Sequence, residues 1–170
     1  MMPFIPALAH ALAPWNSLYS DSKAVASGVT GVHLVGLLFG GGLAVAADRS
    51  TLRALKRPPS DRGAALAELH AVHRPVLIAL AVLFASGVAL ATADIETFLS
   101  SPVFYLKLVI VALLLANGAV LERTERALRR GAGGPHAETR LWRRLKATTC
   151  LSLFLWTCTV VAGTVLVNAA

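Results

Sequence analysis

Two ionisable side chains stand inside otherwise apolar runs of the sequence, and they are the residues best suited to chemistry. They are His33, in the run 25–47, and Lys107, in the run 103–121. A neutral histidine is a common ligand of metals and of haem iron. A lysine in apolar surroundings can lose its proton and act as a ligand or base, or stay charged and hold a propionate. Both are therefore candidate site residues.

Each of these residues also has a purely structural interpretation. The stem of Lys107 is long enough to lift its ammonium group to the membrane surface. His33 can hydrogen-bond to a neighbouring helix, for example to Thr159 or Thr164. At 1.5 Å per residue, His33 and Lys107 both lie about 8 to 12 Å from the same membrane surface, so they can meet at one depth. Matching depth leaves open whether their side chains face each other.

A second group of candidates, Glu68, His70 and His73, lies before the second apolar run. The two histidines are three residues apart, so they share one face of a helix and could ligate a metal or contact a haem edge. The alternative is a solvated helix face beside Arg74, without an adjacent third ligand. His33 is about 20 Å away along the membrane normal, so one haem is not expected to bind both His33 and His73.

The elements that position these residues are expected to be membrane-spanning helices. Hydrophobic residues make up 56% of the 170 residues and charged residues 15%, and the mean hydropathy is +0.66. Each apolar run is close to the ~20 residues that cross a bilayer core, and each is continuously apolar, unlike a barrel strand. We predict an all-α integral membrane bundle and a single domain, 1–170, with four transmembrane helices at 25–47, 75–93, 103–121 and 147–168.

The placement of charge predicts the topology. Fourteen of the 16 basic residues lie in the two connections between the first and second and between the third and fourth runs. By the positive-inside rule these connections are cytoplasmic, which gives N-out, C-out topology. The net charge of +7 is thereby explained by topology and by contact with the lipid bilayer. We expect no nucleic-acid partner.

The segments outside the spans are also partly predictable. The N-terminus lacks the positively charged start of a signal peptide. We expect segment 4–18 to lie in the membrane interface, anchored by Trp15; a poorly ordered tail is the alternative. Residues 97–101 are predicted to form a short external turn, with Pro102 in the first turn of the third helix. That helix is expected to end at Gly131.

Small residues and cysteines suggest packing. Two sets of small residues have the four-residue spacing that lets helices approach closely, Gly36 with Gly40 and Ala81 with Ala85 and Ala89.

Cys150 and Cys158 are too far apart on one helix to form a disulfide, and we expect both in the core. A site for copper alone is disfavoured, because Cu(I) prefers clusters of Met and Cys ligands and the only methionines are Met1 and Met2. Asn117, Trp156 and Thr157 are expected to be core residues.

Three segments resemble a known group of membrane proteins. They are GVHLVGLLFGGGLAVAADR with His33, HRPVLIALAVLFASGVAL with Pro75, and SPVFYLKLVIVALLLANG with Lys107. Together they are similar to the HemJ-type protoporphyrinogen oxidase family and its four-helix relatives, including CopD-like copper-resistance domains. The resemblance covers roughly residues 28–126.

The resemblance implies a haem b site and a set of functional residues. In the HemJ-type family a histidine on the first helix and a lysine on the third are required, and an arginine ends the first helix; His33, Lys107 and Arg49 match these positions. Residues 40–47 and Asn117 depart from the family pattern. A paralogue that keeps the histidine and lysine but has another redox or transport role fits these departures better than protoporphyrinogen oxidation.

Two functional hypotheses follow. The first is a haem b-binding protein of the bacterial inner membrane with a redox role. It would act in electron transfer or, as an oxidoreductase, in tetrapyrrole oxidation. In it His33 is the axial iron ligand, Lys107 is a second ligand or a propionate or proton partner, and Arg49 is an accessory cation. The second is a non-enzymatic membrane module: a copper-handling component, a complex subunit or a small-solute permease. Either could form a homo-oligomer, and the first requires a redox partner.

Overall fold

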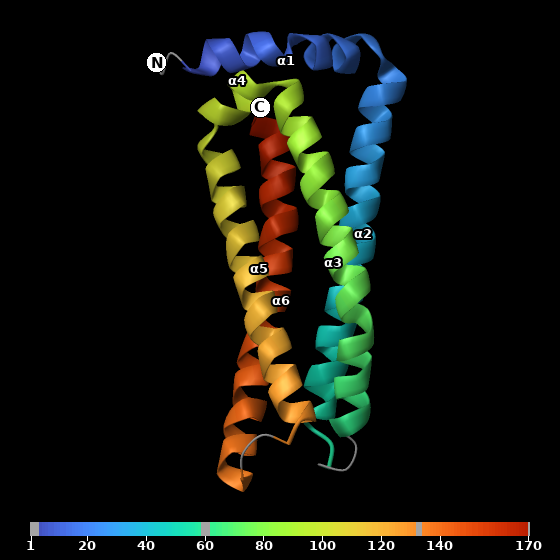
Figure 1. Cartoon of the computed structure of the whole chain (residues 1–170), viewed down its shortest axis with the longest axis vertical. Helices are drawn as coiled ribbons and strands as arrows, with labels where there is room; N and C mark the ends of the chain where they lie inside the picture. The colour runs from blue at the N-terminus through green and yellow to red at the C-terminus, as the bar shows by residue number, and fades with distance from the viewer. Residues whose placement is uncertain (1–3, 59–61, 132–133, 170) are drawn as a thin grey trace.

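The chain is an antiparallel bundle of long helices with one helix lying across its end (Figure 1). The computed structural model describes residues 4–58, 62–131 and 134–169. Within these ranges it contains no strand, and the prediction of an all-α fold is confirmed. In chain order the helices are α1 (Phe4–Asp21), α2 (Lys23–Ala54), α3 (Arg62–Ala93), α4 (Ile95–Ser100), α5 (Pro102–Arg129) and α6 (Pro135–Ala169).

Four of these helices, α2, α3, α5 and α6, are long and apolar enough to cross a membrane. Each contains one of the four predicted apolar runs, as expected of a multi-pass membrane protein. Many large apolar side chains are exposed along them; Leu38 and Phe84, for example, are 72% and 71% exposed. Such a surface is unfavourable in water but matches a lipid environment. The bundle thus has apolar side chains on its outside as well as in its core.

Both chain ends lie at one end of the bundle, called here the termini end, and α1 runs across it (Figure 1). The α2–α3 and α5–α6 connections lie at the opposite end, called here the basic end because most of the basic residues lie in these connections and in the helix ends next to them.

Local sequence signals account for several helix boundaries. The Ser22 hydroxyl accepts a hydrogen bond from the Val25 backbone N–H and caps α2. Pro102 occupies the first turn of α5, where its missing N–H leaves no helical bond unmade. Gly131 follows the end of α5 with φ of 61°, a left-handed conformation that glycine adopts without strain. The predictions for Pro102 and Gly131 are confirmed.

Two segments at the termini end are more ordered than the sequence suggests. Residues 97–101, predicted as a turn, belong mostly to the short helix α4, capped by the Asp94 side chain at the Thr97 N–H. Segment 4–18 lies within α1 and is not a disordered tail. Trp15 of α1 donates its indole N–H to the backbone oxygen of Ala89 in α3, at 3.0 Å. This bond fixes α1 against the bundle.

The four long helices form two hairpins. α2 packs most extensively on α3, and α5 on α6, while α2 and α6 join the hairpins. Gly36 and Gly40 are buried and lie against Leu83 and Ala79 of α3, so their predicted packing role is confirmed. The stripe of Ala81, Ala85 and Ala89 does not form the matching surface, because Ala81 and Ala85 are exposed.

The core has two apolar clusters at different depths. The cluster nearer the basic end contains Leu66, Leu69, Leu121 and Leu145, with Ala47. The other contains Leu114, Leu155 and Trp156. Trp156 is therefore a core residue as predicted, as is the buried Asn117, whereas Cys150 and Thr157 are exposed and the prediction that they lie in the core is wrong.

Candidate functional site

His33 lies on the face of α2 that contacts α3, and its imidazole is held there by a serine. Its Nδ1 atom is 2.9 Å from the Ser86 hydroxyl oxygen. That hydroxyl lies 2.7 Å from the Val82 backbone oxygen, to which it donates its single hydrogen. With this hydrogen on Val82, the Ser86 oxygen can accept a hydrogen bond from Nδ1–H. A second acceptor, the Leu83 backbone oxygen, lies on the same turn of α3.

This bonding pattern is compatible with a proton on Nδ1 of the imidazole. With its proton on Nδ1, a neutral His33 carries its lone pair on Nε2, as a metal-binding histidine does. The ring packs against α3 at Gly87, where a Cβ atom would lie in ordinary van der Waals contact with it, 3.4 Å from His33 Cε1. The partner of His33 is thus Ser86 of α3. The Thr159 hydroxyl, suggested above as its partner, donates to the Leu155 backbone oxygen of its own helix.

Lys107 lies near the same end of the bundle, on α5. Its side chain is partly buried and lies against α6, where a Cβ atom at Gly163 would be 3.6 Å from the lysine Nζ atom. The ammonium group is close enough to His33 to interact with it electrostatically. The structure therefore brings the two candidates toward each other from different helices.

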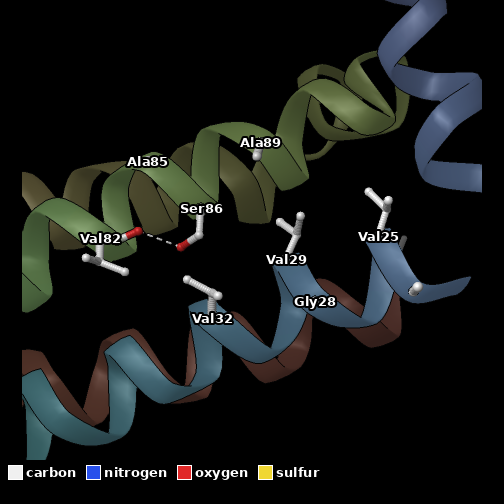
Figure 2. A pocket seen from close by; sticks show the side chains of 9 residues that line it. Val25, Gly28, Val29, Val32, Val82, Ala85, Ser86 and Ala89 are labelled. Carbon is white, nitrogen blue, oxygen red and sulfur yellow. Dashed lines mark hydrogen bonds between the residues drawn. The ribbon is translucent and has the colours of Figure 1, made fainter. Parts of the chain in front are cut away.

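An apolar groove runs between α2 and α3, next to the contact of His33 with Ser86. It has a volume of about 450 Å³, within the range of small-molecule and cofactor pockets. Figure 2 shows Val29 and Val32 of α2 facing Ser86 and Ala89 of α3 across it. Ser86 is thus shared: it lines the groove and holds His33.

The other candidates lie elsewhere. Arg49 is exposed near the basic end of α2, 16 residues and hence about 24 Å from His33. The structure does not bring it to the histidine and lysine.

The histidines of α3 contact acidic side chains of α5. His73 Nε2 lies 3.1 Å from a Glu122 carboxylate oxygen, although without the angle of a hydrogen bond. His70 Nδ1 lies 3.6 Å from a carboxylate oxygen of Glu125, which is 2% exposed. Within the part of the chain that the structure describes, no three His, Cys, Asp or Glu side chains are placed to hold a metal ion. These contacts connect the two hairpins.

A buried polar layer between the two apolar clusters was missed in the sequence. Asp48 of α2 is only 3% exposed, and its carboxylate accepts a hydrogen bond from the Ser152 hydroxyl of α6. Nearby, Asn117 of α5 donates to the Thr148 backbone oxygen at 2.9 Å. The one sequence signal for this layer was that Asp48 directly follows an apolar run. Its neighbour Arg49 was instead chosen as the candidate site residue.

Comparisons with protein-family models, with curated proteins and with solved structures give no match. The functional argument therefore rests on the geometry of the chain's own residues.

Proposed function

We propose that this chain is a haem b-binding membrane protein with a redox role, in electron transfer or tetrapyrrole oxidation, and that His33 is the axial ligand of the iron. The contact between His33 and Ser86 carries this proposal. In it, Ser86 accepts a hydrogen bond from Nδ1–H, and the Nε2 lone pair is then available to a metal. Haem-ligating and zinc-ligating histidines are commonly oriented in this way by a hydrogen bond at the other ring nitrogen.

The surroundings of His33 fit a flat, largely apolar group. The groove beside it is lined mainly by valine, alanine and glycine. The histidine and lysine side chains each pack against a glycine of a neighbouring helix, Gly87 of α3 and Gly163 of α6. Bound haem would supply one-electron chemistry. Lys107 would act as the second ligand or bind a propionate, whereas Arg49 is too far away to take part.

The chain's own residues have separate tasks in this proposal. His33 binds through Nε2, and Ser86 holds the ring so that little orientation is lost on binding. Lys107 supplies a positive charge in a partly buried position, where it can offset a negative group. The apolar groove would contact the ring edges of the bound group.

We further propose that the protein lies in the inner membrane of a bacterium, N-out and C-out, with α1 in the outer interface. The basic residues at one end of the bundle support this orientation. The haem site would then lie near the outer surface. Reporter fusions that are active only outside the cytoplasm should be active at the C-terminus and inactive within the α5–α6 connection.

The experiment for the haem site is an absorbance spectrum of the detergent-purified protein, expressed with ample haem. We expect a Soret band that His33→Ala abolishes and His70→Ala, at the basic end, preserves. Size-exclusion profiles of both variants should match the parent protein. A colourless parent protein would refute haem binding and favour the non-enzymatic alternative, whereas an unchanged band in folded His33→Ala would refute the ligand assignment.

Two further variants test the supporting residues. Ser86→Ala should keep the band but weaken haem affinity about 10- to 100-fold, the usual cost of losing a residue that orients a ligand. Lys107→Met should change the shape of the spectrum if the lysine binds iron. If it binds a propionate, the spectrum should be retained while affinity falls. An unchanged affinity in both Ser86→Ala and Lys107→Met would contradict the roles given to them.

A further inference from the structure

The polar layer around Asp48 contains an unusual carboxylate. Asp48 is 97% buried, and one of its oxygens, Oδ2, has no hydrogen-bond partner among the residues that the structure describes. None of the ion pairs among the described residues includes Asp48. A buried ionised carboxylate without a positive partner is strongly unfavourable. The layer therefore requires a positive charge from outside the chain, or a proton.

Two buried threonines point to a ligand at this position. Threonines within helices commonly donate to the backbone oxygen four residues earlier. Six threonines here do so, namely Thr92, Thr124, Thr148, Thr157, Thr159 and Thr164. The hydroxyls of Thr51 and Thr149, which are 1% and 0% exposed, have no hydrogen-bond partner within the described part of the chain. Their oxygens are free to bind another group.

The helix register brings these side chains together. Asp48 and Thr51 are three residues apart on α2, and Thr149 and Ser152 are three apart on α6, so each pair shares a helix face. The two helices run in opposite directions and contact each other. Because Ser152 hydrogen-bonds to Asp48, the next turn toward the basic end places Thr149 at the level of Thr51.

Apolar residues close this group of four on both sides. Along the same face of α6, Leu145 lies one turn before Thr149 and Trp156 lies one turn after Ser152. Both are buried, at 0% and 5% exposure, in the two separate core clusters. A charge held between them is screened very little by water, so its partner must be close.

We propose that Asp48, Thr51, Thr149 and Ser152 form a binding site for one Na⁺ ion. Carboxylate and hydroxyl oxygens are the donors that hard cations prefer. One carboxylate neutralises one positive charge, whereas a divalent ion would leave a buried excess charge. The proposal goes beyond the haem site and is independent of it, because the two sites share no residue.

The test uses the full chain, purified in detergent without sodium. Its melting temperature should rise with NaCl and saturate, because a ligand that binds only the folded state stabilises it. KCl and choline chloride at equal ionic strength should give smaller shifts. Radioactive ²²Na⁺ should bind at one ion per chain. Equal shifts with all three salts, or no bound ²²Na⁺, would overturn the proposal.

Substitutions locate the site. Asp48→Asn should abolish both the sodium-specific shift and ²²Na⁺ binding, whereas Asp94→Asn, in an exposed position at the termini end, should retain both. Thr149→Val keeps the side-chain shape and should raise the half-saturating Na⁺ concentration about tenfold or more. If Asp48→Asn does not fold, the Na⁺ affinity of Thr149→Val tests the site instead. Sodium binding that survives Thr149→Val unchanged refutes the site. So does a melting temperature that follows pH through Asp48 but ignores Na⁺, since Asp48 then holds a proton.

Discussion

Replacement of Gly40 by alanine should weaken the contact between α2 and α3. A Cβ atom at position 40 would lie 2.8 Å from the Cβ atom of Ala79, whereas ordinary contacts begin at 3.4 Å. The helices would have to separate by about 0.6 Å, and overpacking of this kind typically costs about 1–3 kcal/mol. Alanine also gains about 1 kcal/mol over glycine in helix propensity, so the net effect must be read against a control.

The matched control is Gly42→Ala, two residues along the same helix. A Cβ atom at position 42 meets nothing within 4 Å, so this variant has the propensity gain alone. Thermal unfolding in detergent should place Gly40→Ala below Gly42→Ala by about 1–3 kcal/mol, equivalent to about 2–4 °C per kcal/mol in a chain of this size. Adding Ala79→Gly to Gly40→Ala should recover part of the loss. Equal melting temperatures for the two alanine variants would refute the close approach at Gly40.

Two other contacts give further predictions. Trp15→Phe removes the indole N–H that bonds to the Ala89 backbone oxygen; it should make α1 more sensitive to limited proteolysis while the melting temperature of the bundle changes little, and unchanged cleavage would contradict the anchoring role. Asn117→Leu removes the bond to the Thr148 backbone oxygen; it should lower the free energy of unfolding by about 1 kcal/mol, measured by denaturant titration, and a gain in stability would show that this bond is not needed.

The helical architecture could be predicted because it depends on local features of the sequence, which can be recognised without knowing how the helices pack. Apolar runs of bilayer length predict spanning helices, and Pro102 and Gly131 mark helix boundaries by their backbone restrictions. α4 was missed because six residues next to a turn carry too little periodicity to distinguish a helix from a loop.

The site was only partly predictable, because the rotation of each helix is not encoded in hydrophobicity when lipid is as apolar as the core. His33 and Lys107 were found by being ionisable within apolar runs. Ser86 was not, since a serine in a helix has the same sequence signature whether it binds a histidine or only its own backbone. Asp48 sits at the end of an apolar run, where a surface position was as natural as a buried one.

The two-hairpin construction has a mechanical consequence for the layer around Asp48. The hydrogen bond between Asp48 and Ser152 crosses from α2 to α6, and so joins one hairpin to the other. A small rotation of α5 and α6 as a unit would leave the contacts within each hairpin intact and strain this crossing, together with the contacts of His70 and His73 with the glutamates of α5. If an ion binds in the layer as proposed, its binding and the angle between the hairpins would be coupled.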